Sequence, residues 1–300
     1  MTRLDIEFPS GESRCAAWLF LPETAVPPPV IVMAHGLGAT RDMRLEAFAL
    51  RFVAAGYACL VFDYRHFGDS GGEPRQLLDI ARQRADWRAA IACVRARADV
   101  DAGRVVLWGT SFAGGHAIAV GARDAGVVAV VAQCPFTDGP ASVRKMEAFA
   151  AAKVTVLAVI DWIGSLVGRR PVYVATAGRP GETALMTAPD VAPGYLGLVP
   201  ATTRFRNEVA ARIALAVLFD APGRRLRDLR GPTLVCVCDH DSVAPAAATL
   251  RHAAAAGPNI DVHRYAAGHF DIYAGEWFER AVADQLEFLH RHVPTSGARP

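Results

Sequence analysis

Residues 105–115 read Val-Val-Leu-Trp-Gly-Thr-Ser-Phe-Ala-Gly-Gly, which is the most informative segment of the sequence for the fold. It begins with β-branched and apolar residues, as a buried strand does, and small residues then surround Ser111. A serine at the tip of a sharp strand-to-helix turn needs small neighbours, because the strand and the helix approach each other closely there. Gly109, Ala113 and Gly114 meet that requirement. The stretch therefore predicts a strand, a tight turn and a helix, with Ser111 at the apex as a candidate nucleophile.

The chain on both sides of this turn alternates between strand-like and helix-like segments. Continuous β-branched runs are typical of strands covered on both faces. Repeated strand–helix–strand units with right-handed crossovers give an α/β fold, a mostly parallel central sheet with helices on both faces. Before them, the alternating run 16–21 follows a turn at 9–11 and predicts an antiparallel hairpin. We expect strands at 30–34, 58–62, 105–108, 127–132, 233–238 and 261–265, and helices at 42–55, 77–98, 111–123, 244–256 and 277–290.

The alternation stops between residues 136 and 230. A crossover between parallel strands needs far fewer residues, so this segment holds additional structure. Helix-prone runs are separated in it by a stretch rich in proline and glycine, and they lie at 146–167 and 207–218. We expect a helical lid over the strand ends. The chain then divides into an α/β core of residues 1–135 and 231–293, a lid of residues 136–230, and a frayed tail of residues 294–300.

The apolar side chains of the expected lid have two interpretations, which the sequence leaves open. They line an acyl-binding cleft, or they form the lid's own packing face or a dimer contact. Trp162 and Met146 are the candidate substrate-binding residues. Asp161 lies in the same stripe and should face solvent, pair with an arginine or touch the substrate, because an unpaired buried carboxylate is costly. The stripe comprises Met146, Phe149, Val156, Leu157, Ile160, Trp162, Ile163 and Leu166.

Composition and charge exclude several classes of protein. The 300 residues are 52% hydrophobic and carry a net charge of +2, which argues against extended disorder and against a nucleic-acid partner. The first residues carry charges where a signal peptide is apolar, and Lys153 and Asp161 interrupt the most apolar stretch, 148–167. We expect a cytoplasmic protein without stable membrane insertion.

The six cysteines are irregularly spaced and lie mostly within apolar runs. This pattern favours buried free thiols over a disulfide framework, and no second ligand pair is spaced for zinc near Cys236 and Cys238. We expect no metal site.

A serine hydroxyl needs an imidazole as general base and a carboxylate that orients the imidazole. Asp241 lies just past one expected strand, and His269 lies in the loop after the next. Loops that follow parallel strands open at one edge of the sheet, so both side chains are expected to converge on Ser111. Asp239, two residues earlier, is the competing acid.

Acyl transfer also requires donors for a developing oxyanion. Residues 33–38 read Met-Ala-His-Gly-Leu-Gly and follow the strand that marks the centre of the sheet. We expect the backbone N–H groups of Leu37 and Phe112 to be the two donors. His35 is expected to brace this loop through hydrogen bonds, although a role as the base is the alternative.

Together these motifs resemble the α/β-hydrolase superfamily. The resemblance spans the chain except the expected lid, and it is greatest for the dienelactone-hydrolase-like and prolyl-oligopeptidase-like serine hydrolases. That group includes esterases, thioesterases and polyketide acyltransferases. Ala113 departs from the family pattern, which has glycine there. The matching segments are His-Gly-Leu-Gly at 35–38, the turn at 62–72, Gly-Thr-Ser-Phe-Ala-Gly at 109–114, Asp241, and Gly-His-Phe at 268–270.

The resemblance implies an α/β-hydrolase fold and a serine hydrolase, most simply a carboxylesterase that needs no cofactor. Ser111 would attack an ester or thioester carbonyl, His269 would carry the proton, and Asp241 would orient His269. The turn Asp-Ser-Val-Ala-Pro is similar to the family's acid-bearing turn, which favours Asp241 over Asp239. The turn at 63–72 would be scaffold.

Other activities use the same fold. An acyltransferase would use the same triad, whereas a peptidase of this group usually carries an additional N-terminal domain. A non-catalytic binding protein would be expected to lose a triad member.

The expected partner is a small acyl ester or thioester, and a homodimer is possible. An anionic substrate would call for an arginine clamp, for which Arg65, Arg144, Arg204 and Arg206 are candidates. We favour a neutral, medium-sized acyl substrate.

Overall fold

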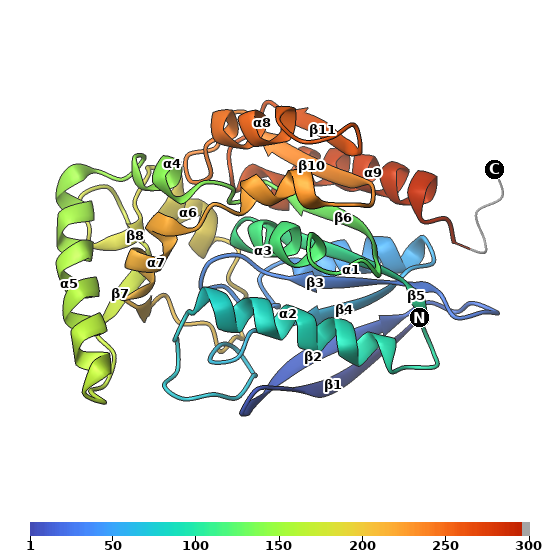
Figure 1. Ribbon diagram of the computed structural model, residues 1–300, viewed down its shortest axis with the longest axis horizontal. Helices are drawn as coiled ribbons and strands as arrows, with labels where there is room; N and C mark the ends of the chain where they lie inside the picture. Colours follow the sequence, from blue (N-terminus) through green and yellow to red (C-terminus); the bar gives the residue numbers. More distant parts are fainter. Residues whose placement is uncertain (296–300) are drawn as a thin grey trace.

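Eight strands form the central sheet of the computed structural model, which describes residues 1–295 (Figure 1). The strand order is β1-β2-β4-β3-β5-β6-β10-β11. The pairs β1–β2 and β2–β4 are antiparallel, and all other neighbours are parallel, so the predicted hairpin and mostly parallel sheet are confirmed. The strands are β1 (Thr2–Ser10), β2 (Ser13–Leu21), β3 (Pro29–Ala34), β4 (Ala58–Phe62), β5 (Asp101–Thr110), β6 (Val127–Gln133), β10 (Thr233–Cys238) and β11 (Ile260–Tyr265).

Helices cover both faces of the sheet. Successive residues of a strand point to opposite sides, so a strand that is apolar throughout presents apolar side chains to both faces, and both must be covered. In β3, Val30 and Val32 pack in the core beneath α2 and α3, whereas Ile31 and Met33 pack in the core beneath α1 and α9. Both cores are therefore built from the same strands. The helices are α1 (Leu45–Ala54), α2 (Ile80–Arg95), α3 (Phe112–Gly121), α8 (Ala246–Ala254) and α9 (Gly275–His292).

The ends of these elements differ from the sequence-based expectations for local reasons. Helix α2 begins at Ile80 rather than at 77, because the Asp79 carboxylate accepts a hydrogen bond from the Arg82 N–H (2.8 Å) and caps the helix. Of the expected tail, the structure describes residues 294 and 295. Thr295 is buried and its hydroxyl donates to the Ala55 carbonyl (3.2 Å). Residues 296–300 of that tail lie outside the described residues.

The segment between β6 and β10 lies at one end of the sheet (Figure 1). It has a small sheet of its own with the order β8-β7-β9. Its core is continuous with the main one, because Val154, Ala158, Val174, Val209 and Ile213 belong to the cluster that packs beneath α2 and α3. Its elements are α4 (Gly139–Val143), α5 (Ala148–Leu166), β7 (Tyr173–Ala177), β8 (Ala184–Met186), α6 (Val191–Leu196), β9 (Val209–Ala210), α7 (Ile213–Phe219) and the 3₁₀ helix η1 (Pro222–Asp228).

The predicted helix over 207–218 is wrong in its first half. Residues 209–210 form strand β9, which pairs antiparallel with β7, and the Ala210 N–H donates to the Gln76 carbonyl (2.9 Å). These partners are distant in sequence, so tertiary hydrogen bonds override the local helix preference. Only the second half, α7, is helical.

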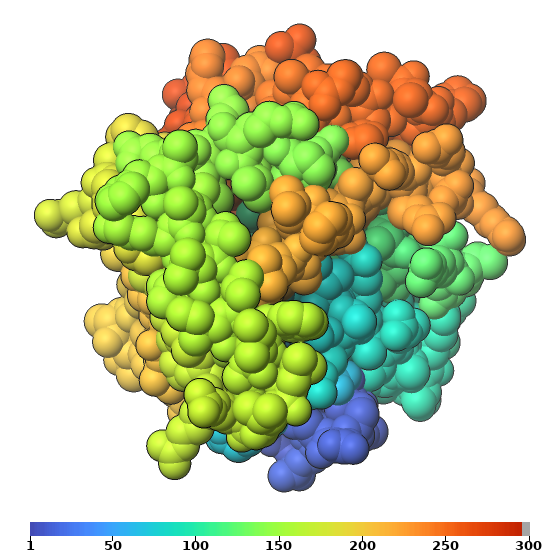
Figure 2. All heavy atoms as spheres, turned by 60° about the vertical axis from the view of Figure 1, so that its left-hand side comes forward, coloured from blue at the N-terminus to red at the C-terminus, as the bar shows by residue number. Residues whose placement is uncertain are grey.

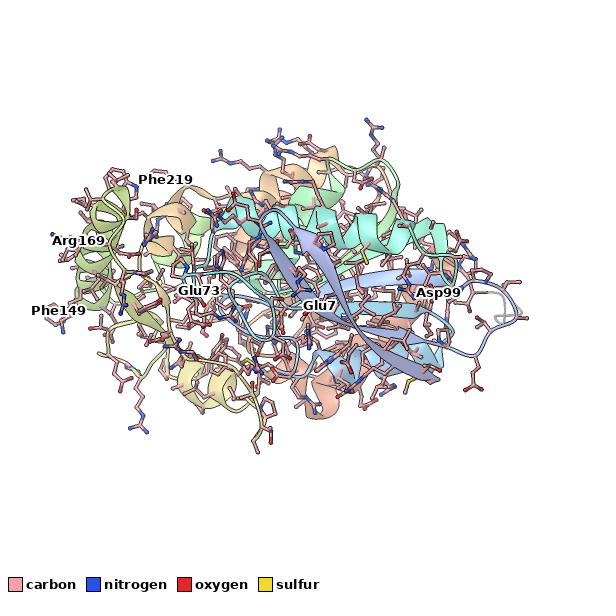
Figure 3. All side chains as sticks on the ribbon, turned by 90° about the horizontal axis from the view of Figure 1, so that it is seen from below. Glu7, Glu73, Asp99, Phe149, Arg169 and Phe219 are labelled. Carbon is pink, nitrogen blue, oxygen red and sulfur yellow. The ribbon has the colours of Figure 1, made fainter. Side chains whose placement is uncertain are left out.

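Helix α5 forms the outermost wall of the molecule and exposes an apolar face. Phe149 and Arg169 project outward at this end in Figure 3. By length and composition alone, α5 could cross a membrane, with a mean hydropathy of 1.6 over a window that is 22% buried. The expectation of no stable membrane insertion remains a prediction. The large exposed apolar residues of this helix are Phe149, Val156, Val159, Ile160, Trp162, Ile163 and Leu166.

Candidate active site

Ser111 lies at the turn between β5 and α3, in a strained backbone conformation. Its φ of 56° and ψ of −121° lie in a sparsely populated region, which costs about 1–3 kcal/mol. The turn is held because the Ser111 N–H donates to the Gln133 carbonyl (2.8 Å) and the Ser111 carbonyl accepts from the Phe136 N–H (2.9 Å). A side chain on Gly109 would lie 2.2 Å from the Ala113 carbonyl oxygen, so glycine is required there. Ala113 is fully buried, and its methyl group is accommodated.

Ser111, His269 and Asp241 form one hydrogen-bonded row. His269 Nε2 lies 3.0 Å from Ser111 Oγ, and His269 Nδ1 lies 2.6 Å from Asp241 Oδ2. The other carboxylate oxygen, Asp241 Oδ1, accepts hydrogen bonds from the N–H groups of Val243 (2.8 Å) and Ala244 (2.6 Å), which fix the carboxylate. The structure thus brings together three residues that follow three different strands.

The surroundings of His269 raise its pKa. Burial is the largest single influence and would lower this pKa. The Asp241 carboxylate, the nearby Cys134 thiol and the hydrogen bond at Nδ1 together outweigh burial and raise the pKa of His269 from 6.5 to about 9. The site therefore stabilises an imidazolium, which is the form that His269 adopts when it takes a proton from a serine hydroxyl.

The competing acid does not reach the imidazole. Asp239 Oδ1 accepts a hydrogen bond from Arg264 Nε (2.8 Å), toward the surface of the molecule. Only Asp241 therefore has the geometry to orient His269.

His35 braces the loop that follows β3. His35 Nε2 lies 2.8 Å from the Met43 carbonyl oxygen, and the Gly36 N–H donates to His35 Nδ1 (2.7 Å). Burial lowers the pKa of His35 to about 4, so its ring is neutral near pH 7. Both ring nitrogens are occupied in this bracing arrangement, as the sequence analysis expects.

Leu37 and Phe112 both line the cavity that contains Ser111. Within residues 1–295, neither N–H group donates to a backbone carbonyl in a turn, loop or cap. The loop lies close to the serine, because a side chain on Gly36 would come within 2.9 Å of Ser111 Cβ. The Tyr195 hydroxyl, on α6, donates to the Leu37 carbonyl (2.7 Å) and so holds the Leu37 peptide from the inserted segment. Tyr195 lies in no recognisable motif, so the sequence gives no indication of this contact.

A largely apolar cavity of about 160 Å³ runs from Ser111 to the inner side of α5. Figure 2 shows a hollow between α4–α5 (green) and α7 (orange). Met146 lines the cavity, as expected, but Trp162 does not and is 51% exposed. The inserted segment supplies Met146, Ala151, Val154, Met186, Leu215 and Val217 to the walls.

The expectation that the apolar stripe of α5 lines the cavity is wrong for most of its residues. Val154 and Ala158 are buried on the inner side of the helix, and their spacing of one helical turn defines that face. Most of the stripe lies on the opposite, exposed side, namely Phe149, Val156, Ile160, Trp162, Ile163 and Leu166.

Asp161 pairs with an arginine, one of the three outcomes that the sequence allows. Its carboxylate accepts hydrogen bonds from Arg212 Nε (2.7 Å), Arg212 Nη2 (2.9 Å) and the N–H groups of Arg212 (2.9 Å) and Val172 (2.8 Å). The buried carboxylate is therefore fully satisfied, and it ties α5 to the chain before α7.

None of the four candidate clamp arginines lines the cavity in the described part of the chain. Arg65 is buried against an aspartate (2.6 Å), while Arg204 and Arg206 pair with acidic neighbours, and Arg144 is exposed. The cation that lines the cavity is Lys145, which the sequence analysis missed.

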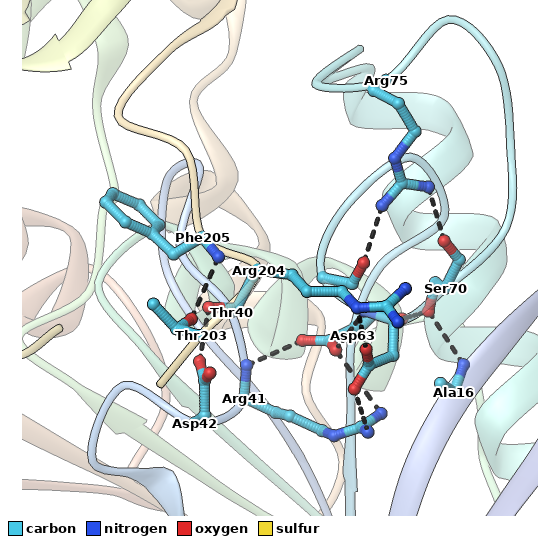
Figure 4. Close-up of polar contacts among 12 residues, drawn as sticks. Ala16, Thr40, Arg41, Asp42, Asp63, Ser70, Arg75, Thr203, Arg204 and Phe205 are labelled. Carbon is cyan, nitrogen blue, oxygen red and sulfur yellow. Dashed lines mark hydrogen bonds and ion pairs between the residues drawn. The ribbon is translucent and has the colours of Figure 1, made fainter. Parts of the chain in front are cut away.

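The turn that begins at Asp63 joins the loop after β3 to the hairpin (Figure 4). Asp63 Oδ1 accepts a hydrogen bond from the Arg41 N–H (2.7 Å). The Ser70 hydroxyl donates to the Asp63 carbonyl (2.7 Å) and accepts from the Ala16 N–H (2.8 Å). These hydrogen bonds connect three segments of the chain, which is the structural role that the resemblance implies for this turn.

Among residues 1–295, no group of three or more His, Cys, Asp or Glu side chains lies close enough to hold a metal ion. All six cysteines are free, and only Cys93 is not fully buried, which matches the predicted buried thiols.

The fold agrees with the comparison to known proteins. The sequence profile of the alpha/beta hydrolase family matches residues 31–281. This chain belongs to the alpha/beta hydrolase family. The predicted α/β-hydrolase fold and family are therefore confirmed, while the lid remains a prediction.

Several proteins of known sequence or structure match most of the chain. The quorum-quenching protein AidA of Acinetobacter baumannii is 55% identical over 97% of this chain and 95% of its own length. The thiohydrolase apmlB of Arthrinium phaeospermum is 29% identical over 87% of this chain and 88% of its own. The alpha/beta hydrolase GrgF of Penicillium superposes with a TM-score of 0.80 at 24% identity, over 97% of this chain and 99% of that one, which supports the fold.

Proposed function

We propose that this alpha/beta hydrolase cleaves carboxylic esters or thioesters through an acyl-enzyme formed on Ser111. The observation that carries the proposal is the row Ser111–His269–Asp241, with heavy-atom distances of 3.0 Å and 2.6 Å. A nucleophile within reach of a base, and a base oriented by a buried carboxylate, is the arrangement that acyl transfer needs.

Each proposed step uses an atom of the chain. Ser111 Oγ attacks the carbonyl carbon while His269 Nε2 takes its proton, and Asp241 Oδ2 stabilises the imidazolium. The N–H groups of Leu37 and Phe112 bind the developing oxyanion. The imidazolium then protonates the leaving alcohol or thiol, and water attacks the acyl-enzyme by the reverse route.

The inserted segment acts as a lid that determines which acyl groups bind. Its apolar walls, with Met146 next to the cavity, suit the acyl part of a substrate. The walls are largely apolar, with Lys145 as the one cation of the lining and no candidate clamp arginine in the described chain, and this apolar character supports a neutral, medium-sized acyl group. A cytoplasmic location and a homodimer remain predictions.

Acyl transfer is the second candidate function. Relatives named as polyketide transferases match this chain over nearly its whole length, at 26% identity for the Aspergillus fumigatus protein af380. The same triad would pass the acyl group to an alcohol instead of water. The 55% identical relative named for quorum quenching supports the further proposal that the substrate is a signalling molecule with an ester or lactone bond.

A substrate panel tests the function. Purified protein is assayed with neutral acyl esters of increasing chain length, a lactone, an acyl thioester and an aminoacyl amide, each with and without an alcohol acceptor. We expect ester or thioester hydrolysis that the Ser111→Ala variant loses by roughly 10⁴-fold or more while it retains its melting temperature. Comparable turnover by that variant would exclude Ser111 as the nucleophile, and an alcohol adduct as main product would favour transfer.

A further inference from the structure

A second cleft, remote from the triad, is lined by six arginines. Its volume is about 520 Å³, within the usual range for small-molecule sites. Residues from the middle of α2, the end of α3, the end of α7 and η1 converge on it. The arginines are Arg84, Arg88, Arg123, Arg224, Arg225 and Arg227.

The positive charge of this cleft is only partly neutralised. Asp220 binds Arg84 Nη2 with both carboxylate oxygens (2.8 and 2.7 Å), and Asp228 pairs with Arg225 (3.1 Å). The other four arginines form no ion pair within residues 1–295, and the buried Nε of Arg84 has no hydrogen-bond partner there. Several unpaired guanidinium groups around one concave surface fit a ligand that carries more than one phosphate.

An exposed aromatic side chain stands at the rim of the cleft. Phe219, the last residue of α7, is 83% exposed and lines the same cleft as the arginines. Figure 3 shows Phe219 at the end of the molecule that carries α5. Solvent-exposed aromatic rings beside basic groups suit a nucleobase, because every base offers a face for stacking. A ligand that carries both phosphate groups for the arginines and a base for Phe219 is a nucleotide.

Helix α7 separates this cleft from the acyl cavity. Leu215, Val217 and Leu218 line the acyl cavity, and the next residue, Phe219, lines the arginine cleft. In Figure 2 the hollow beside α5 lies on one side of α7 (orange) and α2 (cyan) lies on the other. One flexible molecule that crosses the end of this single helix would therefore reach both sites.

We propose that the arginine cleft binds the phosphorylated adenosine of a coenzyme-A thioester, whose pantetheine arm crosses α7 and carries the acyl group to Ser111. This inference rests on the proposed acyl hydrolysis, and it names the thioester class of that site. The arginines pair with the phosphates, Phe219 stacks on the adenine, and the neutral acyl chain occupies the apolar cavity. Hydrolysis of the thioester follows the steps given above: the C–S bond breaks, His269 protonates the departing coenzyme thiolate, and water releases the acyl group from Ser111.

Binding is measured first on the Ser111→Ala variant, so that the result does not depend on catalysis. The probe is adenosine 3′,5′-bisphosphate, titrated by calorimetry. The cleft variant R88A/R123A/R224A should weaken its binding at least tenfold, and Phe219→Ser at least fivefold. The control R169A/R170A/R179A removes the same charge from exposed arginines outside the cleft and should leave the affinity within twofold. No binding to the parent, or equal losses in the cleft variant and the control, would overturn the assignment.

Kinetics with the active protein complete the test. Two thioesters with the same acyl group are compared, one of coenzyme A and one of N-acetylcysteamine, which lacks the nucleotide. In the parent protein, the KM for the coenzyme-A thioester should be at least tenfold lower than the KM for the N-acetylcysteamine thioester. The cleft variant should lose this difference, while its kcat and its kinetics with the N-acetylcysteamine thioester stay unchanged. Equal KM values in the parent would overturn the proposal, as would a preference for an acyl-carrier-protein thioester that the cleft variant abolishes. If neither esters nor thioesters are cleaved while the bisphosphate still binds in the cleft, the proposed function fails and the nucleotide site stands. Cleavage of esters without cleavage of any thioester would overturn the coenzyme-A proposal and leave the proposed function intact.

Discussion

At the scale of single residues, the site depends on the backbone of Ser111 as much as on its hydroxyl group. The positive φ at Ser111 forms the sharp turn between β5 and α3, where the hydroxyl group lies at the apex. Backbone hydrogen bonds from Ser111 to Gln133 and from Phe136 to Ser111 hold this turn. Strain that the surrounding structure maintains is common at functional sites. The hydroxyl is therefore directed at His269 before any substrate binds.

The raised pKa of His269 predicts how activity depends on pH. Only the neutral imidazole accepts the serine proton, and the pKa of His269 is raised to about 9, so kcat/KM should be lost as the pH falls through that value. Asp241→Asn removes the carboxylate that raises this pKa. The acidic limb should then move to lower pH, while the plateau rate falls by roughly 10⁴-fold. The measurement is kcat/KM for a neutral ester from pH 5 to pH 10. If the pH at which kcat/KM falls on the acidic side is the same in the variant as in the parent, Asp241 does not raise the pKa of His269.

At the scale of elements, α5 is oriented by one buried ion pair. Asp161, 1% exposed, receives hydrogen bonds from Arg212 and Val172 and so fixes which side of an almost wholly apolar helix faces inward. Removing one partner of a buried pair leaves the other charge and the amides unsatisfied.

Asp161→Ala should therefore lower the free energy of unfolding by about 2–4 kcal/mol. The loss is smaller than for a fully buried pair, because the partly exposed Arg212 side chain recovers some hydration when its partner is removed. Chemical denaturation measures the loss. Lys153→Ala, at an exposed position of the same helix, is the control and should change stability by less than about 0.5 kcal/mol. Equal effects of the two substitutions would mean that the ion pair does not hold α5.

Two neighbouring alanines of α5 test the acyl cavity. Ala151 lines it, whereas Ala152 is exposed on the outer side. Ala151→Trp should fill the cavity and lower kcat/KM for an octanoyl ester by at least about tenfold, with little effect on an acetyl ester. Ala152→Trp should leave the chain-length profile unchanged. If both variants keep the parent's profile, the acyl chain binds elsewhere.

At the scale of the whole molecule, the inserted segment is not an independent layer over the sheet. Val154, Val174 and Val209 share the main core with the strands, and Tyr195 hydrogen-bonds to the loop after β3. The segment therefore supports the loop after β3 from outside the central sheet. The division into core and lid remains a prediction.

The sequence predicts the parts of this molecule that depend on local residue chemistry. Gly109 and Ser111 mark a turn that few other residues can form, and Asp241 and His269 follow strands whose ends must meet at one edge of the sheet. The inner face of α5 could not be predicted, because both faces are apolar and Arg212, which orients the helix, is distant in sequence. The arginine cleft was missed for a similar reason, since its members come from four separate elements.

If Ser111 is the nucleophile, the acyl group must pass through an ester on its Oγ, and this intermediate can be trapped. The protein is mixed with an ester whose acyl-enzyme hydrolyses slowly, quenched in acid, and analysed by intact mass and peptide mapping. We predict one acyl adduct, located on Ser111, that is absent from the Ser111→Ala variant. Ester hydrolysis with the adduct on a different residue, or with no adduct at any time before the steady state, would contradict the account.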